Sequence, residues 1–263
     1  MKNIALIAAF AIAMVSCKND DDATPANTTV DFTFTQNWDG TSITNADFDT
    51  TTYTNANGEE LTLSKLVYLI SDITFTSSTG VVYDAGDYNL IDVRQGTNLT
   101  FTPDVQIPEG TYTVSFTFGF DDEDNIDGVY LDLNSADSGW GVPGPLGGGY
   151  HYMRMEGKFI DNTSTETTFQ YHTIRANSHT TLPPGPGTLD VLQDTSFEVN
   201  LGQVTVSNNT NVEIKMNVAE WFKNPNQWDL NVWHSTLMPN FDAQIDMHEN
   251  GSNGVFSLGA VTP

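Results

Sequence analysis

Residues 111–118 read TYTVSFTF, and apolar and polar side chains alternate through this stretch without a break. Such alternation places every second side chain on the same face of an extended chain, which is typical of a β-strand with one face in a hydrophobic core. Strand-like stretches recur along the chain and are separated by Gly, Asn, Asp and Pro. They cover residues 30–35, 66–75, 88–93, 150–159, 167–174, 196–206 and 210–218.

Helical periodicity is weak by comparison. No long segment repeats its apolar residues every 3.6 positions, and the helix candidates are short, at residues 64–69, 219–222 and 241–245. No internal repeat is visible. Irregular loops are expected at 121–128 (DDEDNIDG), 138–149 (SGWGVPGPLGGG) and 181–187 (TLPPGPG). The sequence therefore predicts an all-β fold, a single β-sandwich domain with long loops and a few short helices.

The amino-acid composition excludes some classes of binding partner. The chain has 263 residues, of which 38% are hydrophobic, enough for a sizeable core. It carries 34 acidic and 9 basic residues, a formal charge of −25. A protein that binds the nucleic-acid backbone needs Lys and Arg to displace counterions, so nucleic acid is excluded as a partner. Direct attraction to anionic lipid headgroups is disfavoured for the same reason.

The first residues resemble a secretion signal. Lys2 is followed by about a dozen apolar residues, too few to span a bilayer as a helix. This stretch ends at Ser16 and Cys17, the only cysteine of the chain. The pattern resembles a bacterial lipoprotein signal, in which residues 1–16 are removed and Cys17 is lipidated. The alternative is an ordinary signal peptide with an incidental cysteine.

The segment after Cys17 is polar and acidic. Lys18 and Asn19 precede three aspartates, which resembles the surface-export signal of Bacteroidetes lipoproteins. We expect residues 17–29 to form the lipidated Cys and a flexible tether, followed by the folded domain at 30–259. These features predict an outer-membrane lipoprotein, periplasmic or surface-exposed, held to the membrane by its lipid alone. The Lys/Asp run favours the surface.

The search for reactive groups finds few motifs. GxSxG, HExxH, P-loop and Rossmann fingerprints are all absent from the sequence, so we do not expect an enzyme. His151 and Met153 lie two apart in a predicted strand, with Met155 next on the same face. Imidazole with thioether is a soft donor set that suits Cu(I). The alternative is that both methionines fill the core. His172 lies in another predicted strand, and histidines on neighbouring strands can share a metal ion.

Two other features allow different functions. The acidic loop at 121–127 offers oxygen ligands for Ca²⁺, although it lacks the bidentate Glu of an EF-hand. Trp140, Trp221, Trp228 and Trp233 could stack on sugars, or the last three could simply pack near a short helix. These residues support an alternative hypothesis, a surface β-sandwich module that binds a glycan or a protein.

Six short motifs, in order, resemble the MbnP family, also called MopE-like copper-binding proteins. The strand at 66–75 resembles the family pattern YxIS(D/N)IxL, and 169–172 resembles FxxH. Trp140 with 149–157 resembles WxxGYxFxxxEG. The other three are residues 89–92 (LID), 107–119 (IPxGxYxxxxFxxG) and 250–256 (NGxxVF). The resemblance runs from about residue 30 to 259.

The resemblance implies a copper site. Characterised relatives are extracytoplasmic and β-rich, and they bind copper through two histidines and a tryptophan oxidised to kynurenine. That oxidation is attributed to a di-haem partner related to bacterial cytochrome c peroxidases. By this resemblance His172 is a copper ligand, and Trp140 stands where the family has a conspicuous Trp. The Trp-x-His of the best-known relative is absent here, and Trp233-His234 is the nearest element.

The expected function is therefore copper capture or handling by a lipid-anchored, extracytoplasmic, non-catalytic protein. Copper is expected as Cu(I). The candidate ligands are His172, His151, Trp140 and Met153, with His234 and His248 as the next candidates.

Overall fold

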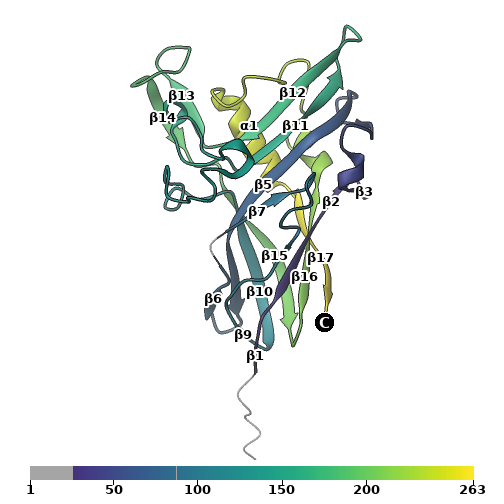
Figure 1. The fold of residues 1–263 in the computed structure, drawn as a ribbon, viewed down its shortest axis with the longest axis vertical. Helices are drawn as coiled ribbons and strands as arrows, with labels where there is room; N and C mark the ends of the chain where they lie inside the picture. Colours follow the sequence, from purple (N-terminus) through teal and green to yellow (C-terminus); the bar gives the residue numbers. More distant parts are fainter. Residues whose placement is uncertain (1–25, 87) are drawn as a thin grey trace, which may run out of the picture.

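A computed structural model describes residues 26–86 and 88–263 of the chain. The predicted all-β sandwich is confirmed (Figure 1). The larger sheet has eight strands and the path β12-β11-β5-β10-β15, with β4, β6 and β7 also paired to β5. Its strands are β4 (Tyr53–Thr54), β5 (Glu60–Ser77), β6 (Val82–Asp84), β7 (Tyr88–Asp92), β10 (Gly110–Phe118), β11 (Met153–Ile160), β12 (Glu166–Thr173) and β15 (Phe197–Val206).

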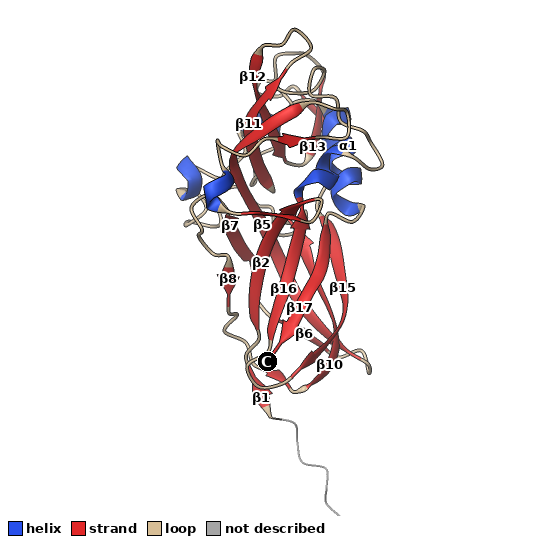
Figure 2. Cartoon of the chain, turned by 90° about the vertical axis from the view of Figure 1, so that its right-hand side faces the viewer, coloured by secondary structure: helices blue, strands red, loops and turns tan. Residues whose placement is uncertain are grey.

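The second sheet has five strands and the path β17-β16-β2-β3, with β8 paired to β2. Its β16 runs parallel to β2, and the other pairs are antiparallel. The strands are β2 (Asp31–Trp38), β3 (Thr41–Ile43), β8 (Thr100–Phe101), β16 (Asn211–Asn217) and β17 (Phe256–Thr262). Figure 2 shows β2, β16 and β17 side by side. Two small ladders pair β1 (Asn27–Thr28) with β9 (Ile107–Pro108), and β13 (Ala176–His179) with β14 (Leu189–Gln193).

The main core lies between the two sheets. Phe32 and Phe34 of β2 are buried there together with Val114, Phe116 and Phe118 of β10, which are the apolar positions of the TYTVSFTF stretch. The same core also contains Tyr171 of β12, whose ring centroid lies 4.6 Å from that of Trp228 and 6.0 Å from that of Trp221. The alternation read from the sequence thus selects the face that each strand buries.

Strand β5 extends over both halves of the larger sheet. Its residues 61–68 pair with β11 and its residues 70–77 with β10. The helix expected at 64–69 is wrong, because these residues lie inside β5. Residues 66–71 are buried on both faces of the sheet. Their sequence therefore lacks the alternation of apolar and polar residues that marks a half-buried strand.

The second face of β5 is covered by a long loop. Val67 and Leu69 point to this side and pack with Phe120, Leu133, Trp140 and Tyr150. We call this cluster the second core and the segment 119–149 the covering loop. The covering loop includes the acidic and Gly/Pro-rich stretches, both of which lie outside the strands as expected. It contains two short 3₁₀ helices, η2 (Ala136–Ser138) and η3 (Gly144–Leu146).

The remaining helices are few, as expected. The short helix at 219–222 is confirmed as η4 (Val218–Phe222), and the one at 241–245 is confirmed and longer, as α1 (Phe241–Ser252). A further turn, η1 (Asn45–Asp47), was not expected. Within the part of the chain that the structure covers, none of the helices has the length and apolar character needed to cross a membrane. The predicted signal peptide and Cys17 lie outside the described residues.

Candidate metal centre

Two histidines meet on the side of the larger sheet that carries the second core. The ring centroids of His151 and His172 are 5.6 Å apart, and their planes are nearly perpendicular at 83°. His151 is 3% exposed, and the side chain of His172 is 12% exposed. The two histidines singled out from the sequence therefore converge.

The register of the sheet explains the position of His172. It pairs with Arg154 of β11, and Arg154 pairs with Val67 of β5. Residues paired across strands share a face, so His172, Arg154 and Val67 form one row on the second-core side. Its neighbours Tyr171 and Thr173 point to the opposite face, where Tyr171 belongs to the main core.

His151 reaches the same side because the chain bends before β11. The strand was expected to begin at residue 150, but it begins at Met153. Tyr152 and Met153 are consecutive, yet both are buried in the main core. The alternation is therefore broken between them, and His151 lies beside His172 and not beside Met153. The expectation that His151, Met153 and Met155 share a face is wrong.

Met153 and Met155 line the main core instead. Both are fully buried and pair with Tyr68 and Leu66 of β5, respectively, on the side away from His172. The alternative interpretation of these methionines as core residues is confirmed. Met153 is separated from the histidine pair by the sheet itself.

Each histidine has one ring nitrogen held by an oxygen acceptor. Nδ1 of His151 lies 2.9 Å from the carbonyl oxygen of Trp140, and Nε2 of His172 lies 2.9 Å from Oε1 of Glu156. We assign the ring N–H to these nitrogens because a carbonyl and a carboxylate can only accept. Nε2 of His151 and Nδ1 of His172 then carry the lone pairs. A hydrogen-bonded N–H opposite the ligating nitrogen is the usual arrangement in metal-binding histidines.

Trp140 is the third predicted residue at this place. Its ring centroid lies 5.7 Å from that of His151, and its carbonyl oxygen also accepts the backbone N–H of His151 at 3.1 Å. The side chain is completely buried in the second core, and its Nε1 has no hydrogen-bond partner. The covering loop therefore brings Trp140 next to the histidine pair.

Four charged residues at the site were not identified from the sequence. The guanidinium of Arg154 lies 4.9 Å from the Trp140 ring centroid, and one of its nitrogens is 3.3 Å from Nδ1 of His151. Arg154 and Lys65 both form ion pairs with Asp137, at 3.1 and 2.6 Å. Glu156 is the partner of His172. The signal was the alternation Arg154-x-Glu156, which puts two charges on the face that His172 shares.

The electrostatics keep His151 neutral. Burial, the largest cause, together with the nearby positive charge of Arg154 and the influence of His172, lowers the pKa of His151 to about 3. The pKa of Glu156 is also lowered, because its hydrogen bond with His172 stabilises the carboxylate. At neutral pH the pair thus consists of a neutral His151 and a His172 that faces a carboxylate.

The other histidines are apart from this pair. His179 contacts Thr188 and Asn177 within the β13–β14 region, and His248 contacts the carbonyl of Thr195. His234 follows Trp233, but its Nδ1 contacts the carbonyl of Leu230 and its ring packs on Phe159.

The features behind the alternative functions have structural roles. Trp221 and Trp228 are 0% and 1% exposed in the main core, so they present no platform for a sugar. In the acidic loop, Asn125 is buried, accepts the backbone N–H of Tyr150 and donates to the hydroxyl of Tyr152. Within residues 26–86 and 88–263, no three His, Cys, Asp or Glu side chains gather as a metal site. The histidine pair is therefore a centre with two strong donors.

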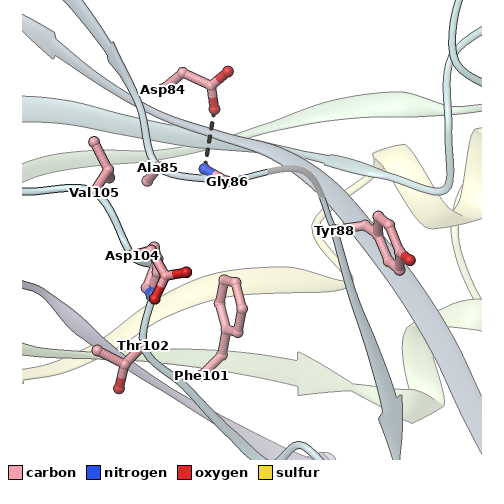
Figure 3. A pocket seen from close by; sticks show the side chains of 9 residues that line it. Asp84, Ala85, Gly86, Tyr88, Phe101, Thr102, Asp104 and Val105 are labelled. Atoms are coloured by element: carbon pink, nitrogen blue, oxygen red, sulfur yellow. Dashed lines mark hydrogen bonds between the residues drawn. The ribbon is translucent and has the colours of Figure 1, made fainter. Parts of the chain in front are cut away.

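An open cavity lies elsewhere on the molecule. It has a volume of about 510 Å³ and is lined by Asp84, Tyr88, Phe101 and Asp104, among others (Figure 3). None of its lining residues belongs to the histidine pair.

Comparison with known proteins agrees with the motifs. The MbnP family profile matches residues 27–239. A solved structure, MbnP from Methylosinus trichosporium, is similar with a TM-score of 0.52 and 14% sequence identity, covering 89% of this chain and 99% of that one. No curated protein sequence matches the chain. With most of its length matched by the family profile and its sandwich shared with that structure, this chain belongs to the MbnP family.

Proposed function

We propose that the protein binds one Cu(I) ion between His151 and His172 and serves in copper capture or handling, without catalysis. The observation that carries the proposal is the convergence of the two imidazoles, with centroids 5.6 Å apart. Metal–imidazole bonds are about 2 Å long, so two imidazoles bound to one ion have centroids roughly 5–6 Å apart. The pair therefore has a spacing that one ion can bridge.

The two imidazole donors favour a soft metal ion that needs only a few ligands. Imidazole suits copper, and Cu(I) can be held by as few as two or three donors. His151 does not need to lose a proton at neutral pH, because its pKa is about 3. The carbonyl of Trp140 and the carboxylate of Glu156 orient the two rings. Burial shields the pair from water, which favours retention of the reduced ion.

If Trp140 were oxidised, it would adjoin a metal bound at the histidine pair. We propose it, and not Trp233, as the residue that a di-haem peroxidase-like partner would convert to kynurenine. The support is its ring contact with His151 at 5.7 Å. Mass spectrometry of the peptide that contains Trp140, from protein expressed with and without such a partner, tests this assignment. An unchanged Trp140 peptide in both samples would contradict it.

The sequence of the first residues supports a proposal about where the protein is located in the cell. We propose that Cys17 carries the lipid and that the protein is an outer-membrane lipoprotein, facing the surface or the periplasm. The charge of −25 supports a role in which only the lipid contacts the membrane.

Titration of the purified lipoprotein, in which Cys17 is lipidated and has no free thiol, with Cu(I) tests the metal proposal. Competition with a chromophoric chelator under reducing conditions should show one tight equivalent. We expect His172→Ala and His151→Ala to lose it. His179→Ala and Met153→Leu are the matched controls, because His179 lies away from the pair and Met153 points to the other face. Unchanged binding in both ligand variants, or no binding by the wild type, would refute the proposal.

A further inference from the structure

Two basic side chains, Arg154 and Lys65, lie at the histidine pair although the protein is strongly acidic, and both pair with Asp137. The chain has only nine Lys and Arg residues, three of them Arg. Arg154 approaches Nδ1 of His151 to 3.3 Å, and Lys65 lies behind it on the same aspartate. A site that only had to attract cations would not be expected to hold these groups. The presence of Arg154 and Lys65 at a proposed metal-ion site therefore needs a functional explanation.

Arg154 is fixed in place on several sides. Its guanidinium donates to the carbonyl and carboxylate of Asp137, both at 3.1 Å, and to the carbonyl of Gly139 at 2.5 Å. The ring of Trp140 covers one face of the guanidinium. Its side chain is 13% exposed, so little water screens its charge. Arginine also remains charged at all physiological pH values.

Four charged side chains surround the pair: Arg154 and Lys65 are positive, and Asp137 and Glu156 are negative. A divalent ion adds one more positive charge to this buried site than a monovalent ion does. The second charge would lie close to Arg154, where repulsion is poorly screened.

We propose that Arg154 makes the histidine pair selective for a monovalent over a divalent metal ion. This inference rests on the proposed function, because it assumes that His151 and His172 bind the metal. The fixed guanidinium repels a divalent ion about twice as strongly as a monovalent one. At about 6 Å and an effective dielectric constant of about 20 to 40, the extra repulsion corresponds to roughly a tenfold to hundredfold change in relative affinity. Arg154 is a specificity residue and not a ligand.

The test compares Cu(I) with Zn(II), a divalent probe that needs no control of oxidation state. Affinities of the purified full-length chain are measured by chelator competition for the wild type, Arg154→Gln and Arg154→Lys. We expect Arg154→Gln to shift the preference toward Zn(II) at least roughly tenfold. Arg154→Lys keeps the charge but loses the planar hydrogen-bonding fork, so it should keep the wild-type preference.

Thermal unfolding of the metal-free variants separates selectivity from a structural role. If Arg154 only held the covering loop in place, both substitutions would lower the unfolding midpoint and weaken the binding of both metals equally. That result would overturn the inference. An equal Cu(I)-to-Zn(II) ratio in all three proteins would also overturn it while leaving the copper proposal intact. Absence of Cu(I) binding in the wild type would refute both. If Arg154→Gln does not fold, Lys65→Gln should give a smaller shift in the same direction.

Discussion

Replacing His151 with asparagine is expected to make the fold less sensitive to mild acid. Asparagine places an amide N–H near the position of Nδ1, so it can still donate to the carbonyl of Trp140, but it does not titrate. In the wild type, burial and Arg154 lower the pKa of His151 to about 3, against 6.5 for an ordinary histidine. The unfolded chain therefore takes up a proton below pH 6.5 that the folded chain refuses.

The sign and size of the effect follow from this difference in proton binding. As the pH falls from 6.5 toward 3, the unfolded state binds more protons, and the free energy of unfolding decreases by about 1.4 kcal/mol per pH unit. Between pH 7.5 and 5.0 the contribution of His151 amounts to about 2 kcal/mol. The asparagine variant lacks this contribution. Groups shared by both proteins cancel in the comparison, and pH 5.0 stays above the range where most carboxylates are protonated.

Urea denaturation of the metal-free proteins at several pH values measures the effect. The relevant quantity is the loss of unfolding free energy between pH 7.5 and 5.0, compared between wild type and His151→Asn, and not the absolute stability of either. An equal loss in both proteins would show that His151 titrates normally and is open to water. The account of a neutral, buried imidazole ready to bind a metal would then be refuted.

Three further changes have defined outcomes. Gly157→Ala should cost at least about 3 kcal/mol in chemical denaturation, because a Cβ there would lie 1.9 Å from the carbonyl oxygen of Thr62, whereas Gly144→Ala, with open space around it, should change little. Equal effects of the two would contradict the close approach of β11 to β5. Asn125→Ala should lower the free energy of unfolding by about 2 kcal/mol, because it leaves the buried backbone N–H of Tyr150 without its acceptor. A value near zero would show that Asn125 does not hold the acidic loop to Tyr150. Cys17→Ser should move the protein from the membrane to the soluble fraction, and retention in the membrane fraction would refute lipid anchoring.

Much of the fold could be predicted because alternation is a local property. The pattern of residues 111–118 alone identifies which side chains of β10 enter the main core. The same reasoning failed at residues 64–69, where burial on both faces of β5 removes the alternation. It also missed β17, whose residues are mostly half-exposed or exposed, and the small β13–β14 ladder.

The site could be predicted only in part. His172 was found because it lies in a recognisable motif, and His151 because imidazole is a characteristic ligand. Their convergence depends on the bend at Tyr152 and on the register of the paired strands. Neither can be predicted from the pattern of apolar and polar residues in the sequence. Arg154 and Asp137 come together through a loop that approaches from another part of the chain. Such contacts are set by tertiary packing and not by spacing.

The length of β5 has a consequence for how the protein unfolds. One uninterrupted strand supplies backbone partners to β11 near the histidine pair and to β10 in the lower half of the sandwich in Figure 1. Because β5 belongs to both halves, disordering this strand would break both ladders, so the domain is expected to unfold as one cooperative unit. The amides of β5 should be among the slowest to exchange with deuterium. An ion captured between His151 and His172 would then slow hydrogen exchange at the far end of the same strand.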